Sequence, residues 1–143
     1  MDSAPPARIL VVANRTAATP RLLGAVRERA ARSPSTFVLL VPRPYWDPDT
    51  EEAAATVELA IPLLERAARG HVEYIIGESD PFLAVREALE HGQFDEVIVS
   101  TLPERVSHWL RRDLPCRVER LGVPVTVVTA EQTERAVTLT ESP

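Results

Sequence analysis

The sequence predicts an α/β fold in which a parallel sheet is covered by helices on both faces. Five short apolar runs, rich in β-branched residues, have the pattern of strands that are buried on both sides. Four longer segments with apolar residues at helical spacing separate these runs. Because strands and helices alternate, the connections are expected to be right-handed crossovers that place helices on both faces of the sheet.

The composition is typical of one globular domain. The chain has 143 residues, of which 45% are hydrophobic and 26% are charged, and this length buries a substantial core. We expect a single domain over residues 1–130 and a polar C-terminal tail over 131–143. The formal net charge of −5 argues against nucleic acid as a partner. All 16 basic residues are arginine, which excludes mechanisms that need a lysine.

Neither a signal peptide nor a membrane helix is expected. The first eight residues, MDSAPPAR, lack the charged-then-apolar pattern of a signal, and no apolar run approaches the roughly 18 residues of a membrane span. The three histidines lack metal-ligand spacing. The lone Cys116 has no cysteine partner and is interpreted as a buried small residue. We therefore expect a cytoplasmic protein without a metal.

The first two strands flank an amphipathic helix. Residues 8–13, RILVVA, form the first strand, and residues 36–41 form the second. Between them, Thr19 is predicted to be the N-cap of a helix that has Pro20 at its first position. This helix ends before Ser33.

A second helix follows a Pro-rich loop and ends near Arg69. Pro62 lies inside this helix and is expected to kink or split it, and Gly70 is the expected C-terminal cap. Residues 71–77 form the third strand, whose early alternation of polar and apolar residues predicts a position closer to a sheet edge.

The remaining elements repeat the same alternation. Ser79 or Asp80 caps a helix over residues 81–91, and residues 95–100 form the fourth strand. A capping box from Thr101 to Glu104 then starts a basic helix, which Asp113 is expected to restart or bend. The fifth strand is Val123–Val128.

The candidate binding site lies after the first and fourth strands. Ligands of such sheets bind beyond the carboxyl ends of the strands, where the strand order reverses. With the first strand central, the reversal falls between the first and fourth strands, so their two turns and the following basic helix face the ligand. The candidate residues are Asn14, Arg15, Thr16, Ser100, Thr101, Arg105, Ser107, His108 and Arg112.

Two interpretations of these residues remain open. In one, the free amides of a helix start and the basic side chains of Arg105 and Arg112 form an anion or phosphate pocket. In the other, the arginines form a solvated face and residues 14–16 are a plain polar turn. No catalytic residue is predicted, because Ser107 and His108 are adjacent on a helix and point about 100° apart.

Several segments of the chain resemble segments of the universal stress proteins. The resemblance covers Arg8–Thr129 and rests on ILVVAN, GESDPFLAVREAL, FDEVIVS and the closing PVTVV. It implies a three-layer sandwich of the adenine nucleotide alpha hydrolase type, with a five-stranded parallel sheet in the order 3-2-1-4-5. Members of this family often bind ATP.

The resemblance does not extend to the family's nucleotide motif. The first strand of the family usually ends in an Asp, where this chain has Asn14. The family's Gly-x2-Gly-x9-Gly-Ser/Thr motif falls on Ser100, Pro103 and Asp113-Leu114. Pro103 has no N–H to donate, and Asp113 would repel a phosphate. We therefore expect a divergent member with weak or no ATP binding.

Two functional hypotheses follow. The preferred one is a non-catalytic stress-response domain that forms a homodimer through the edge strand Val123–Val128 and binds a small anionic ligand weakly or not at all. It has no nucleic-acid or membrane partner. The alternative is a switch that binds or slowly hydrolyses ATP, in which Arg105, His108 and Arg112 replace the missing glycine amides.

Overall fold

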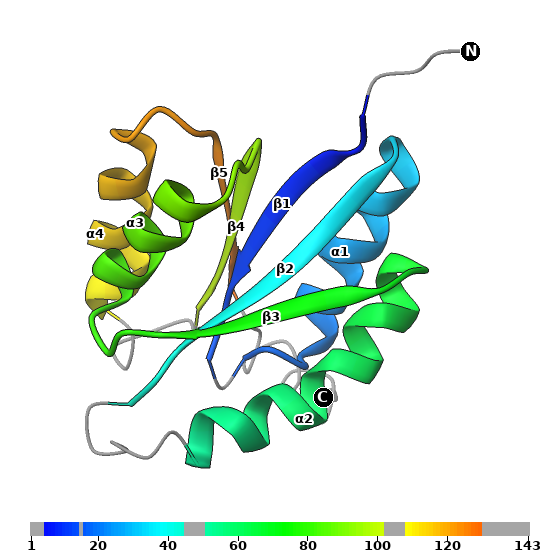
Figure 1. The fold of residues 1–143 in the computed structure, drawn as a ribbon, viewed down its shortest axis with the longest axis horizontal. Coiled ribbons are helices and arrows are strands. Elements are labelled where there is room, and N and C mark those ends of the chain that lie inside the picture. Colours follow the sequence, from blue (N-terminus) through cyan, green and yellow to red (C-terminus); the bar gives the residue numbers. More distant parts are fainter. Residues whose placement is uncertain (1–4, 15, 45–50, 102–107, 130–143) are drawn as a thin grey trace, which may run out of the picture.

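The computed structural model confirms the predicted three-layer α/β fold (Figure 1). It describes residues 5–14, 16–44, 51–101 and 108–129. Five parallel strands form one sheet in the order β3-β2-β1-β4-β5, as the resemblance implied. The elements are β1 (Ala7–Val12), α1 (Pro20–Arg32), β2 (Ser35–Pro42), α2 (Glu51–Ala68), β3 (Val72–Gly77), α3 (Pro81–His91), β4 (Glu96–Thr101), α4 (His108–Glu119) and β5 (Val125–Thr129).

The central strand β1 is buried on both faces, which explains its unbroken apolar sequence. Ile9 and Val11 point into one core, which α1 and α2 cover. Leu10 and Val12 point into the other core, under α3 and α4. Successive strand residues face opposite sides of a sheet, so every position from Ile9 to Val12 must be apolar. Figure 1 shows the two pairs of helices on opposite faces of the sheet.

The helix starts confirm one predicted cap and correct another. Asp80 caps α3 as expected, since its Oδ1 accepts hydrogen bonds from the backbone N–H groups of Phe82 and Leu83. Thr19 occupies the N-cap position of α1, but its hydroxyl donates to the Thr16 carbonyl oxygen at 3.0 Å instead of accepting from the helix. The Thr19 hydroxyl is therefore used within the turn before α1 and does not cap the helix.

Neither α2 nor α4 is split at the position where an interruption was predicted. Helix α2 runs from Glu51 to Ala68 without being split at Pro62, because buried residues on both sides of the proline hold the helix against the sheet: Ala53, Val57, Ala60, Leu64 and Ala67. Helix α4 runs continuously through Asp113.

Three further expectations need correction. Cys116 is exposed, not buried, because α4 turns Leu114 and Val118 toward the core. The positive φ after α2 lies at Arg69, one residue before Gly70. The last strand begins two residues later than expected, at Val125.

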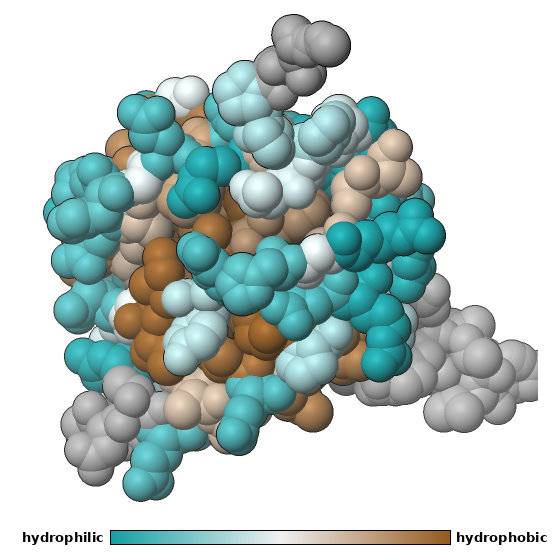
Figure 2. All heavy atoms as spheres, turned by 45° about the vertical axis from the view of Figure 1, so that its right-hand side comes forward, coloured by the Kyte–Doolittle hydropathy of each residue, from teal (hydrophilic) through white to brown (hydrophobic). Residues whose placement is uncertain are grey.

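Large apolar side chains reach the surface mainly at the two edges of the sheet. In the described part of the chain, Tyr74 and Ile75 of β3 and Val127 of β5 are exposed, and so are Leu59 of α2 and Leu121 after α4. Figure 2 shows apolar surface between the polar side chains on one side of the molecule. No helix among the described residues has the length and apolar character needed to cross a bilayer.

One ion pair joins the end of α1 to the start of β4. Arg29 donates three hydrogen bonds to the Glu96 carboxylate, at 2.8, 3.0 and 3.1 Å, and also contacts the hydroxyls of Ser33 and Ser35. The Arg29 side chain is 10% exposed and that of Glu96 is 27% exposed. The hydrogen bond from Arg29 lowers the pKa of Glu96 below its usual value.

Replacing Glu96 with glutamine tests this pair. We expect the free energy of unfolding at pH 7 to fall by about 1–2 kcal/mol, because a charged multidentate partner is lost. The folded-state pKa of Glu96 is lowered, so the wild-type advantage is complete above the ordinary pKa of 4.5 and is lost as the pH falls through the folded value. Urea unfolding curves of the two proteins should therefore converge at acid pH.

The Glu90→Gln variant is the matched control for this experiment. Arg86 and Glu90 form an exposed pair on α3 with a separation of 3.9 Å, and losing it should cost less than about 0.5 kcal/mol. Equal losses in the Glu96→Gln and Glu90→Gln variants would contradict a special role for the Arg29–Glu96 pair.

Candidate functional site

The predicted reversal of strand order lies at the centre of the sheet. β1 and β4 are neighbours, and the chain leaves them toward opposite faces, to α1 after β1 and to α4 after β4 (Figure 1). Because these connections diverge, the carboxyl ends of β1 and β4 border the position where ligands bind in folds of this kind. Residues 13–14, 16–19 and 100–101 are the described parts of this position.

Two predicted site residues meet at this point. The Thr16 and Ser100 hydroxyl oxygens lie 2.7 Å apart and form a hydrogen bond. Thr16 is 4% exposed and Ser100 is 1% exposed. These are the buried polar residues of the described chain, so each hydroxyl offsets the desolvation of the other. One hydroxyl donates to the other, which ties the turn after β1 to the end of β4.

The third predicted residue, Asn14, joins β1 to the strand on its other side. Its Nδ2 donates to the Pro42 carbonyl oxygen at the end of β2, at a distance of 3.0 Å. Backbone bonds from Ala17 N–H to the Asn14 carbonyl and from Thr19 N–H to the Thr16 carbonyl close two successive turns. The loop is thus held by its own hydrogen bonds and by both neighbouring strands.

The remaining predicted residues are placed only in part. Thr101 is the last residue of β4 and lies opposite Thr129 of β5, and His108 and Arg112 belong to α4. Arg15, Arg105 and Ser107 lie outside the described residues, as does the capping box from residue 102 onward. The structure therefore brings Thr16 and Ser100 together, with Asn14 on the same loop as Thr16, and leaves the basic half of the site as a prediction.

The chemistry of the described site is that of hydrogen bonding. The hydroxyl of Ser100 bonds to another hydroxyl, whereas a nucleophile needs a base such as histidine or a carboxylate in contact. Among residues 5–14, 16–44, 51–101 and 108–129, no cluster of three or more histidine, cysteine or acidic side chains could hold a metal ion.

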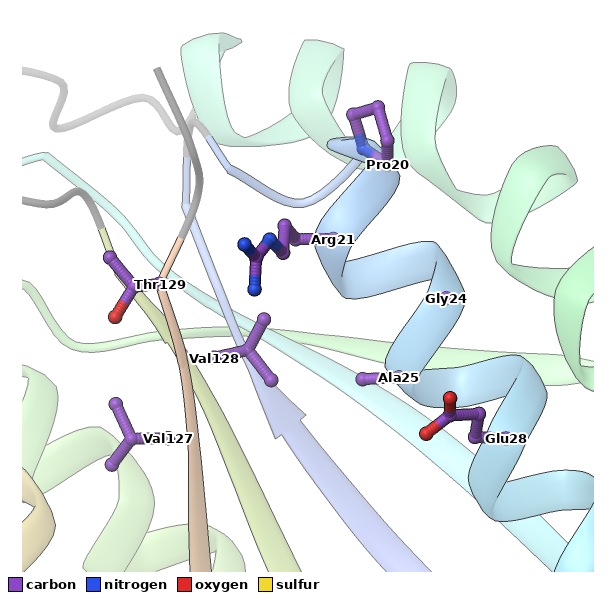
Figure 3. Close-up of a pocket in the computed structure, with 8 residues that line it drawn as sticks. All are labelled: Pro20, Arg21, Gly24, Ala25, Glu28, Val127, Val128 and Thr129. Carbon is purple, nitrogen blue, oxygen red and sulfur yellow. The ribbon is translucent and has the colours of Figure 1, made fainter. Parts of the chain in front are cut away.

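A groove that the sequence did not predict runs between α1 and the edge strand β5 (Figure 3). Its volume is about 530 Å³, and its lining consists of Pro20, Arg21, Gly24, Ala25, Glu28, Val127, Val128 and Thr129. Apart from Ala25, which packs partly against the core, these α1 residues lie off the buried stripe of the helix, so periodicity alone assigns them to solvent. Gly24 in the middle of a helix is the one local signal, because glycine there is unfavourable without a packing reason.

Comparison with known proteins establishes the fold. No protein-family model and no curated protein matches the chain. A universal stress protein solved in complex with cAMP has a TM-score of 0.67 and 16% identity, with coverage of 90% of this chain and 100% of that chain. A universal stress protein from Archaeoglobus fulgidus has a TM-score of 0.57 and 14% identity, with coverage of 87% and 99%. The chain therefore has the fold of the universal stress proteins.

The Thr16–Ser100 hydrogen bond is tested by a double-mutant cycle. Ser100→Ala or Thr16→Val alone leaves one buried hydroxyl without its partner, so each should lower the free energy of unfolding by about 1–3 kcal/mol. The double variant removes both polar groups and should be less destabilised than the sum of the two single variants. Urea unfolding of all four proteins gives the coupling, and additive losses would show that the two hydroxyls act independently.

Proposed function

We propose that this chain is a universal-stress-protein-like domain over residues 1–130 that works in the cytoplasm by binding and carries out no catalysis. The observation that carries the proposal is the Thr16–Ser100 hydrogen bond at the reversal of strand order. At the place where a related fold would hold its ligand, this chain puts two hydroxyls that satisfy one another. Among the residues that the structure describes, neither is paired with a base, which supports a structural role for them.

This site binds a small anion only weakly, or binds no ligand. The described polar groups are already engaged, since the Asn14 amide donates to the Pro42 carbonyl and the two hydroxyls are buried. A ligand must displace these bonds, and the lost bonds reduce the net gain on binding. One structural neighbour was solved with cAMP, which supports a nucleotide as the first anion to test. The alternative, an ATP switch, relies on Arg105, His108 and Arg112.

Titration calorimetry with ATP and magnesium, and separately with cAMP, decides between these two functions. We expect dissociation constants weaker than about 100 µM, which corresponds to roughly 5.5 kcal/mol of binding free energy. Denaturing the purified protein should release no nucleotide. Tighter ATP binding that is lost in Arg105→Ala but kept in Arg27→Ala, an exposed position on α1, would establish the switch and refute our preference.

We also propose that the chain forms a homodimer through β5. Among the described residues β5 pairs with β4 alone, and its sequence, VTVVT, carries no charge. The other edge strand, β3, is protected, because Glu73 places a charge on it and the Glu65 carboxylate accepts a hydrogen bond from its first N–H, at Val72. An uncharged edge pairs readily with another strand, whereas charged side chains oppose such pairing.

The Val127→Arg variant tests this interface. Val127 is 43% exposed, so an arginine there should leave the fold intact but place two like charges at the two-fold axis and weaken the dimer. The matched control is Tyr74→Arg, which adds the same charge to the other edge at a position that is 55% exposed. Light scattering after size exclusion should show monomers for Val127→Arg and dimers for Tyr74→Arg. The reverse result would move the interface to β3.

A further inference from the structure

We propose that a pocket at the amino ends of β4 and β5 binds a small organic cation in which an ammonium group is joined to an apolar body. The pocket has a volume of about 470 Å³, which is within the range of small-molecule sites. Its lining consists of Leu89, Gly92, Gln93, Phe94, Asp95, Leu121, Gly122 and Val123. These residues precede β4 and β5 or belong to the ends of α3 and α4, so the pocket lies at the opposite end of the strands from the candidate site.

One part of the pocket lining is continuous with the core under α3 and α4. Leu89, Phe94 and Val123 are partly buried and pack against that core, whereas Leu121 is 44% exposed. A ligand with an apolar body would remove water from this surface, which favours binding. A Cβ at Gly92 would lie 3.1 Å from Cε2 of Phe94, so glycine allows the end of α3 to approach the ring closely.

The two helix ends at the pocket favour a positive charge. α3 ends at His91 and α4 ends at Glu119, and residues from both ends line the pocket. The last carbonyl groups of a helix carry a partial negative charge that stabilises cations near the final turn. The exposed ionisable side chains around these two ends are Glu90, His91, Glu119 and Arg120. The carboxylates among them outnumber the single guanidinium, so the side chains do not cancel the effect of the helix ends.

Asp95 adds a full negative charge to the pocket lining. Its Oδ2 accepts a hydrogen bond from the backbone N–H of Arg8 at 2.8 Å, and no ion pair among the described residues includes Asp95. Arg29 is within electrostatic reach of Asp95 but is bound to Glu96. The Arg8 side chain donates to the Gln93 carbonyl oxygen instead. The charge of the Asp95 carboxylate is therefore available to a ligand.

The position of Arg8 shows that groups in this region hold an organic cation. Its guanidinium carbon lies 4.7 Å from the centroid of the Phe94 ring, and its Nε donates to the Gln93 carbonyl oxygen at 2.8 Å. Phe94 and Gln93 also line the pocket, whereas Arg8 does not. The pocket therefore combines an aromatic ring and backbone carbonyl groups, the kinds of group that already bind a guanidinium here, with a carboxylate.

A matched pair of probes tests the preference for a cation. 2-Phenylethylammonium and 2-phenylethanol have nearly the same size and shape, but only the first is charged. NMR titration of the isotope-labelled protein at pH 7 measures both dissociation constants and locates each probe through the shifts of backbone amides. We expect the cation to bind at least about fivefold more tightly, with shifts centred on residues 89–95 and 120–123. Added salt should weaken binding of the cation and leave that of the alcohol unchanged.

Three variants test the roles of the lining residues. Asp95→Asn removes the charge but keeps an oxygen that can accept the Arg8 N–H, and it should weaken binding of the cation about threefold without affecting the alcohol. Leu121→Ala should weaken binding of both probes, because it removes apolar surface. The matched control is Glu73→Gln, which removes one charge from an exposed position on β3, at the other edge of the sheet. It should change neither dissociation constant.

Three results would overturn the proposal. Equal affinity for the two probes would exclude a preference for charge, and the absence of shifts with both probes up to their solubility would exclude the site. Shifts centred on the groove between α1 and β5, or on the turn after β1, would place the binding elsewhere. Circular dichroism checks that each variant is folded. If Asp95→Asn does not fold, the two probes and the salt titration on the wild type still give the answer.

Discussion

The burial of β1 on both faces is the constraint on which the rest of the structure depends. A strand without a polar side must be covered twice, so the chain has to place helices above and below the sheet. α1 and α2 cover one side of β1, and α3 and α4 cover the other. Because of this requirement, the connections after β1 and β4 lead to opposite faces of the sheet. The candidate binding site lies where they separate, beyond the carboxyl ends of these two strands.

The hydrogen bonds at this position hold the strand ends together. Thr16 bonds to Ser100 on one side of β1, and Asn14 bonds to the Pro42 carbonyl on the other, so the ends of β2, β1 and β4 are tied through one short loop. Groups engaged in this way are poor partners for a ligand. The two edges of the described sheet differ, because the Glu65 carboxylate accepts a hydrogen bond from the first N–H of β3, whereas the sequence of β5 carries no charge.

Periodicity predicted the elements well and their ends poorly. The apolar runs and helical stripes led to the correct order of elements, since buried faces require these patterns in any tertiary setting. The ends depended on competition between local bonds. The Thr19 hydroxyl bonds back to the Thr16 carbonyl, and the positive φ at the end of α2 lies at Arg69, next to the expected cap Gly70. Cys116 was misplaced because sequence alone does not show which side of α4 faces the sheet.

The sequence by itself determined the fold class and the neighbouring positions of Thr16 and Ser100, because both depend on residue types at positions set by strand and helix periods. The tertiary structure decided what those residues do. The Thr16 and Ser100 hydroxyls bond to each other because folding brings the turn after β1 within hydrogen-bond distance of the end of β4. The groove beside β5 is likewise a product of packing, since Gly24 and Val128 are distant in the chain and meet only when α1 lies against the sheet.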